Sequence, residues 1–190
     1  MFRKLVFCVC ISTIFVLADV EARDLSSIVN VKVPDLELVN QNGEKGKFLS
    51  DIIGDNLAAI TFTYTTCCTV CPILDGVFQK IQNQLGNQLG KDAILISLSI
   101  DPVTDIPQRL KARSEELKAK PGWYFLTGEK STVNDILKAL EVYTTDITNH
   151  PPTVFIVDGQ KKVWSRINGF PYTASVKNVL DEFIASRTAQ

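Results

Sequence analysis

Two stretches of the chain are almost uninterrupted runs of apolar residues. Leu57 to Phe62 and Ala93 to Ile100 lack the polar alternation of a half-exposed strand, so both indicate buried strands. Apolar residues at helical spacing follow each run, over Ile73 to Leu85 and Asp105 to Lys120, the second with Asp105 as an expected N-cap. We therefore expect two central strands, each leading into a helix.

The flanking segments predict further strands and helices around this centre. Val33 to Val39 alternates apolar and polar residues and runs into the turn residues Asn40 to Gly43, which predicts a hairpin. Further expected elements are a lead-in at Leu25–Lys32, a helical turn at Phe48–Gly54, strands at Trp123–Leu126, Val154–Val157 and Lys162–Ile167 (the last two joined at Asp158-Gly159), and helices at Ser131–Leu140 and Thr173–Ile184. Strands that alternate with helices predict an α/β fold, a three-layer sandwich with a central mixed sheet and an N-terminal β-hairpin.

The first 22 residues have the pattern of a secretory signal. Arg3 and Lys4 form a short positive region, Leu5 to Leu17 is an apolar run, and Val20-Glu21-Ala22 places small residues where a signal peptidase cuts. The run is shorter than the roughly 20 apolar residues that a membrane span needs. We predict a signal peptide at 1–22 and an exported, periplasmic domain at 23–190; the alternative is an uncleaved anchor in the inner membrane.

Composition limits the partners and the chemistry. The chain has 20 Lys+Arg and 21 Asp+Glu, scattered along its length, with a net charge of −1, so nucleic acid is not an expected partner. Signal cleavage would remove Cys8, Cys10 and the only Met, and would leave three cysteines and one histidine. Because exported proteins meet an oxidising environment, these cysteines are expected to be disulfide-bonded, metal-bound or kept reduced by a partner.

The three remaining cysteines lie together, between the first central strand and its helix. They belong to the stretch Tyr64-Thr65-Thr66-Cys67-Cys68-Thr69-Val70-Cys71-Pro72. Pro72 suits a first helical position, so Cys71 is expected close to the helix N-terminus. Free amides and the helix dipole favour a thiolate there, which is a common route to a reactive or metal-binding cysteine.

Four short motifs follow one another along the chain. They are Thr-x-Cys-x-x-x-Cys-Pro from Thr65, Ser-x-Asp-Pro from Ser99, Trp-x-x-Leu-Thr-Gly from Trp123, and the isolated His150 before a strand. Together they resemble the Sco/SenC family, and the similarity extends from about Val33 to the C-terminal helix. The resemblance implies a thioredoxin-like fold that binds copper through two cysteines and a histidine. It also implies a role at the dinuclear copper site of cytochrome c oxidase, either delivering the metal or keeping thiols reduced.

Carried over to this chain, the resemblance implies Cys67, Cys71 and His150 as copper ligands. Thiolates hold Cu(I) well and an imidazole is an acceptable third ligand. The alternative for a lone loop histidine beside prolines is a solvated side chain. The expected partner is the copper-receiving subunit of cytochrome c oxidase or another thiol protein.

Two features depart from the family pattern. Cys68 is an extra cysteine, which gives a Cys-x-x-Cys spacing with Cys71, and two prolines separate His150 from its strand. The chain is therefore alternatively a thiol-disulfide oxidoreductase, in which Cys67 or Cys68 attacks a disulfide and Cys71 resolves the product. Pro152 resembles the cis-proline of thioredoxins, and a cis peptide there would dock an extended substrate beside the thiols. A static disulfide and a peroxidase are further alternatives, but no arginine is evidently placed to activate a peroxide.

Asp101 follows the second central strand and would place a carboxylate at the same edge of the sheet. It could tune the thiols or support a metal from behind its ligands. The alternative is that it caps the following turn, which is the commoner use of Asp before Pro.

Overall fold

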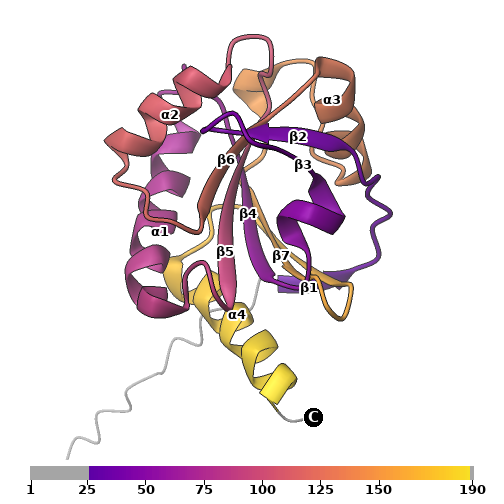
Figure 1. Ribbon diagram of the computed structural model, residues 1–190, viewed down its shortest axis with the longest axis vertical. Helices are drawn as coiled ribbons and strands as arrows, with labels where there is room; N and C mark the ends of the chain where they lie inside the picture. The colour runs from indigo at the N-terminus through magenta and orange to yellow at the C-terminus, as the bar shows by residue number, and fades with distance from the viewer. Residues whose placement is uncertain (1–25, 189–190) are drawn as a thin grey trace, which may run out of the picture.

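The computed structural model describes residues 26–188 and contains a mixed sheet with helices on both faces (Figure 1). The strands are β1 Ser26–Val29, β2 Glu37–Asn40, β3 Lys45–Lys47, β4 Leu57–Thr63, β5 Ala93–Ser99, β6 Trp123–Thr127, β7 Thr153–Asp158 and β8 Val163–Asn168. The helices are α1 Val70–Leu85, α2 Pro107–Glu116, α3 Lys130–Ala139 and α4 Thr173–Thr188, with short turns of helix at Phe48–Ile53, Gly86–Gln88 and Ile147–Asn149. The predicted signal sequence, residues 1–22, lies outside the described residues.

The strand order is β1-β8-β7-β4-β5-β6-β2-β3. The three strands β4, β5 and β6 run parallel, whereas β7 is antiparallel to β4, with Thr61 opposite Val154. The carboxyl ends of β4 and β5 therefore meet the start of β7 and the end of β8 at one edge of the sheet. The cysteine loop, Thr65 to Thr69, follows β4 at this edge.

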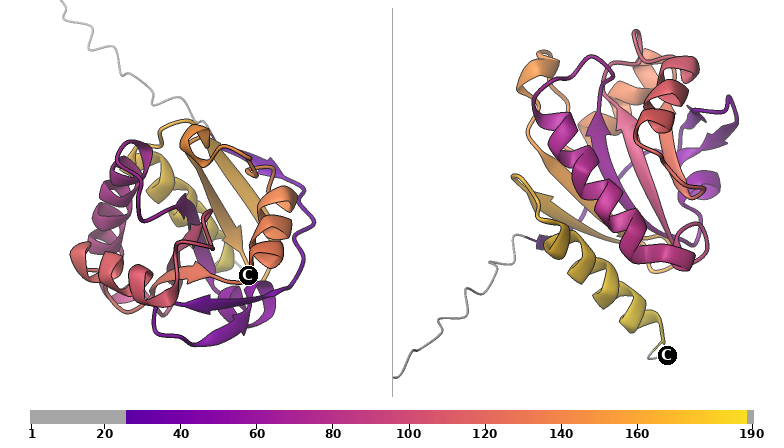
Figure 2. Two further views of the ribbon diagram at one scale, coloured as in Figure 1. Left: turned by 90° about the horizontal axis from the view of Figure 1, so that it is seen from above. Right: turned by 90° about the vertical axis from the view of Figure 1, so that its left-hand side faces the viewer.

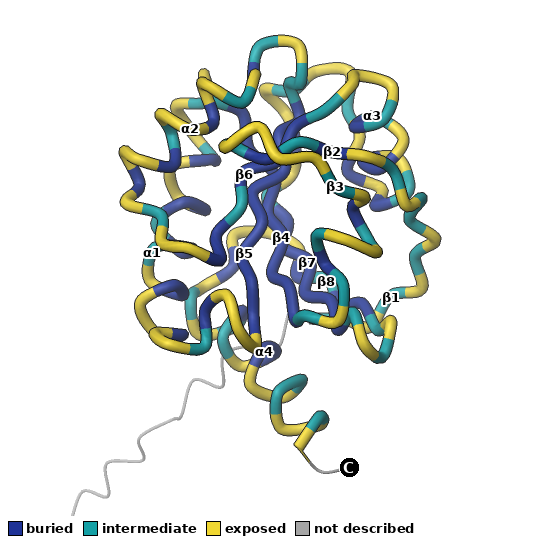
Figure 3. The backbone as a smooth tube through the Cα atoms, viewed as in Figure 1, coloured by how far each residue is buried: buried dark blue, intermediate teal, exposed yellow. Residues whose placement is uncertain are grey.

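Both faces of the central strands are covered, which explains their unbroken apolar sequence. On β4, Leu57 and Ala59 face the layer of α1, α2 and α4, while Ile60 and Phe62 face the layer that holds α3. Figure 2 shows the helices on opposite sides of the sheet, and Figure 3 shows the central strands buried along their length. The three-layer sandwich and the β2–β3 hairpin are confirmed.

Three local expectations are corrected. Residues Ser26–Val29 are an edge strand paired with β8 rather than a lead-in, a pairing between distant segments that local sequence does not reveal. Helix α1 begins at Val70, three residues earlier than expected, because proline is tolerated throughout a first helical turn. Helix α2 begins at Pro107 after Ile106, so Asp105 is not its N-cap.

Within residues 26–188, no helix combines the length and the apolarity needed to cross a membrane.

Candidate metal centre

Cys67 and Cys71 come from adjoining parts of the strand-to-helix connection. Cys67 lies in the loop after β4, and Cys71 lies in the first turn of α1. The backbone amide of Cys71 donates a hydrogen bond to Cys67 Sγ at 3.3 Å, and both thiols are free. Cys67 is half-buried, whereas Cys71 is only 1% exposed.

The two thiols differ in acidity because their surroundings differ. Burial, the largest cause, and the neighbouring Cys67 together raise the pKa of Cys71 to about 12. Partial burial also acts to raise the pKa of Cys67, but hydrogen bonds from Cys71, from the Thr69 backbone and from the Tyr64 hydroxyl bring it below its ordinary value. The thiolate is therefore favoured at Cys67, and not at Cys71 as its place near the helix N-terminus suggested.

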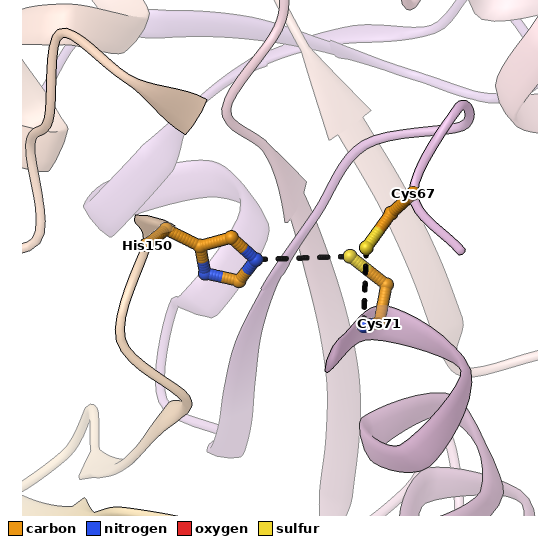
Figure 4. A group of neighbouring side chains, drawn as sticks. All are labelled: Cys67, Cys71 and His150. Atoms are coloured by element: carbon orange, nitrogen blue, oxygen red, sulfur yellow. Dashed lines mark hydrogen bonds between the residues drawn. The ribbon is translucent and has the colours of Figure 1, made fainter. Parts of the chain in front are cut away.

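His150 reaches the thiols from the loop that precedes β7. Its ring Nε2 lies 3.8 Å from Cys71 Sγ (Figure 4), and its side chain is 5% exposed. The ring also meets Tyr64 edge to face, with the ring centroids 5.9 Å apart. Burial lowers the pKa of His150 against a smaller opposing effect of the Pro151 backbone, so the neutral imidazole, which has a free lone pair, is favoured.

The loop before His150 is organised by one carboxylate. Asp146 accepts hydrogen bonds from the Thr148 amide at 3.0 Å, the Thr148 hydroxyl at 2.6 Å and the Asn149 side chain at 2.6 Å. These contacts fix the short helical turn Ile147–Asn149, which ends one residue before His150. The backbone of His150 is extended, as expected for a residue before proline.

Together these elements bring two sulfurs and one imidazole nitrogen within 4.8 Å of one another. Figure 4 shows His150 and Cys67 directed toward Cys71 from two different segments. Soft thiolates with an imidazole form a donor set suited to Cu(I) or Zn²⁺, and three converging ligands leave room for exchange with an incoming ligand.

The other residues singled out from the sequence lie around this cluster without joining it. Cys68 is exposed beside Cys67. Asp101 accepts a long hydrogen bond from the Thr104 amide at 3.4 Å, as in a turn cap. The peptide before Pro152 is trans, as are all peptide bonds of residues 26–188, so the expected cis-proline is wrong. Trans is the favoured isomer even before proline.

Sequence reasoning missed the residue that anchors the cysteine loop. Asp105 is fully buried, and its carboxylate accepts hydrogen bonds from the Thr65 amide at 3.1 Å, the Thr65 hydroxyl at 2.5 Å and the Ser99 hydroxyl at 2.6 Å. It thereby ties Thr65, at the start of the cysteine loop, to the end of β5. The sequence did offer one signal, since Asp105 is a second Asp four residues after Asp101. The structure places Asp105 in the loop before α2 and not in the helix.

The fold and the site define a class of protein. It is a thioredoxin-like domain with two cysteines and one histidine gathered where the first long helix begins. Within that class the chain belongs to the SCO1/SenC family, whose family model matches residues 29–185.

Similar proteins support this placement. A SCO2-like protein of Rickettsia conorii is 35% identical over 116 residues, which is 60% of this chain and 54% of the relative, so the match spans about half the relative's length. The structure of BsSco, a member of the Sco family of cytochrome c oxidase assembly proteins, is 23% identical with a TM-score of 0.70, covering 86% of this chain and 98% of BsSco. Bradyrhizobium japonicum ScoI with copper bound is 20% identical with a TM-score of 0.65, covering 80% of this chain and 98% of ScoI. The structural likenesses confirm the fold.

Proposed function

We propose that this protein is an exported copper chaperone that binds Cu(I) through Cys67, Cys71 and His150. The observation that carries the proposal is the convergence of their three ligand atoms within 4.8 Å. Family membership supports it, as does the copper bound by ScoI of Bradyrhizobium japonicum. Copper is cargo here, so the site must both hold the ion and release it.

The surroundings of the ligands suit both requirements. Cys67 is the more acidic thiol and the more exposed one, so it is the natural first ligand for an arriving ion. Cys71 must lose its proton as the metal binds, because a coordinating thiol is deprotonated. The buried neutral imidazole then completes the set without a proton to lose from the coordinating nitrogen.

We propose the copper-receiving subunit of cytochrome c oxidase as the partner. BsSco is described as belonging to a family of cytochrome c oxidase assembly proteins, which supports this choice. The signal-like residues 1–22 support an exported location. Membrane contact would follow only if that segment stays uncleaved.

An anaerobic Cu(I) titration against a competing chelator tests the ligand set. His150→Ala should weaken Cu(I) binding at least tenfold, which corresponds to about 1.4 kcal/mol, because the imidazole is a ligand. Cys68→Ser is the matched control and should bind as the wild type does, since Cys68 is exposed and outside the cluster. An unchanged Cu(I) affinity in His150→Ala would remove His150 from the ligand set. A loss of Cu(I) affinity in Cys68→Ser would mean that the cysteine roles are wrongly assigned.

A second candidate function, thiol-disulfide exchange, is favoured by the same pair of thiols. The Cys67 thiolate would attack a disulfide of the partner, forming one S–S bond and releasing one partner thiolate; Cys71 would then attack Cys67 and release the second partner thiol. The lowered pKa of Cys67 and the burial of Cys71 match these two roles. Reduction of a model disulfide should then survive Cys68→Ser and fail in Cys67→Ser. The opposite result would make Cys68 the attacking thiol.

A further inference from the structure

Large apolar side chains are exposed mainly at one edge of the molecule. Seven such side chains are exposed within residues 26–188, and five of them lie in the loops and the first helical turn at the edge that carries the metal centre. We call these five residues the apolar rim: Ile73 (51% exposed), Val103 (68%), Ile106 (47%), Phe170 (49%) and Tyr172 (73%).

The strand register shows that the rim loops meet around the cluster. Thr63 and Ser99 are paired at the ends of β4 and β5, so the cysteine loop adjoins the loop that holds Val103 and Ile106. On the other side, Thr153 pairs with Asn168. The loop with Phe170 and Tyr172 therefore adjoins the segment of His150. The left view of Figure 2 looks onto this edge of the sheet, where α1 begins.

The same loops are almost free of charge. The segments 64–73, 147–152 and 168–173 contain no Asp, Glu, Lys or Arg, and segment 100–107 contains only Asp101 and the buried Asp105. Charged residues make up 22% of the whole chain. Ile106 lies at the outer limit of the rim, where it lines a pocket together with Glu37, Lys45 and Glu129. The other rim segments combine exposed apolar side chains with almost no charge, which is typical of a surface that a partner covers.

Burial of the ligands limits how a partner can reach the cluster. Cys71 is 1% exposed and His150 is 5% exposed, whereas Cys67 is half-buried and Cys68 is exposed. An incoming ligand therefore approaches beside Cys67 and Cys68, in the loop that adjoins the loop of Val103 and Ile106. A partner that takes the metal there lies against the rim.

We propose that the apolar rim is the docking surface for a client protein that presents soft ligands, thiols or thioethers, within an uncharged apolar face. This inference rests on the proposed function. A bilayer surface is disfavoured because interfacial membrane binding relies on Lys and Arg beside apolar residues, and the rim segments have neither. Since the rim segments carry so few charges, association should change little with ionic strength.

The test is the rate of Cu(I) transfer from the loaded protein to the purified copper-receiving domain of cytochrome c oxidase. The double variant Phe170→Asp with Tyr172→Asp should transfer at least tenfold more slowly while keeping its Cu(I) affinity, since neither residue is a ligand. Ile28→Asp is the matched control, because Ile28 is 68% exposed on β1, outside the rim. Its transfer rate should equal that of the wild type, and the wild-type rate should change less than about twofold between 0.05 and 0.5 M salt.

A copper-free measurement separates the rim from the chaperone function. In the Cys71→Ser background, Cys67 attacks the disulfide of the oxidised domain and stays joined to it, with one domain thiol released. The rim substitutions should slow this mixed-disulfide formation as they slow transfer. If the wild type binds no Cu(I), the chaperone proposal fails, and the mixed-disulfide rate alone decides whether the rim docks the domain.

Several results would overturn the docking proposal. One is a rim variant that transfers Cu(I), or forms the mixed disulfide, as fast as the wild type does. Another is a steep fall of the wild-type rate with salt. Rim-dependent binding to neutral phosphatidylcholine vesicles, or a rim-dependent dimer, with transfer unaffected, would assign the surface to lipid or to a second copy of the chain instead.

Discussion

Cys67 and Cys71 are four residues apart in sequence but have different environments. The amide of Cys71 points at Cys67 Sγ, and the Cys71 thiol is buried under the loop. Proximity to the helix N-terminus predicted a thiolate at Cys71, whereas the pKa is lowered at Cys67 and raised at Cys71. It could not predict which thiol benefits, because that depends on how the loop folds back over the first turn of α1.

Asp105 is the residue on which the position of the cysteine loop depends most. Asp105→Ala would leave the Thr65 amide and the hydroxyls of Thr65 and Ser99 without their acceptor, so we expect a loss of about 2 kcal/mol or more in the free energy of unfolding. Urea denaturation measures this loss. Asp101→Asn is the control and should change stability by less than about 0.5 kcal/mol, because Asp101 accepts only a long bond. Equal effects of the two substitutions would refute the anchoring role.

At the scale of the element, the turn before His150 shows how hydrogen bonds within a loop can fix the position of a candidate ligand. Asp146 holds three donors of Thr148 and Asn149, and those hydrogen bonds lower its pKa. These hydrogen bonds involve no metal ion, so the chain itself holds the turn, which reduces the entropy lost on binding.

Asp146→Ala should therefore weaken Cu(I) binding severalfold without unfolding the protein. Chelator competition measures the affinity, and circular dichroism checks the fold. Asp146→Asn should recover part of the affinity, because the amide oxygen still accepts hydrogen bonds. Thr145→Ala, next in the chain and outside this turn's hydrogen bonds, should have no effect. A wild-type affinity in Asp146→Ala would show that His150 is positioned by other contacts.

Most elements could be predicted from local patterns, and the exceptions have a common cause. The buried strands β4 and β5, the hairpin and the main helices follow from apolar periodicity and turn residues. Strand β1 and the true role of Asp105 depend on contacts between distant segments. The trans peptide before Pro152 instead follows the general preference of the peptide bond. The motifs grouped Cys67, Cys71 and His150 correctly in space, but exposure and hydrogen bonding at each thiol needed the fold.

At the scale of the whole molecule, α4 is tied to the sheet at the edge away from the metal centre. Asp158, which is 1% exposed at the end of β7, accepts two hydrogen bonds from Arg187 at 2.5 and 3.0 Å. Burial acts to raise the pKa of Asp158, but Arg187 and the Lys161 amide outweigh it, so the pKa lies below its ordinary value.

A lowered carboxyl pKa makes the stability of the fold sensitive to acid. The pair stabilises the fold fully above the unfolded pKa, which is about 3.9, and the stabilisation is lost as the pH falls through the folded value. The difference in unfolding free energy between wild type and Asp158→Asn should therefore shrink as the pH is lowered from 7 toward about 3. Urea titrations at several pH values measure it. A difference that stays constant with pH would contradict this account.

The central claim is that one copper ion is held by two cysteine sulfurs and one histidine nitrogen. The most direct test is the X-ray absorption spectrum of the reduced protein loaded with one equivalent of Cu(I). The account predicts three-coordinate copper with two sulfurs and one imidazole, and loss of the imidazole signal in His150→Ala. Copper bound by sulfur alone in the wild type, whether by two thiols or by three including Cys68, would contradict it.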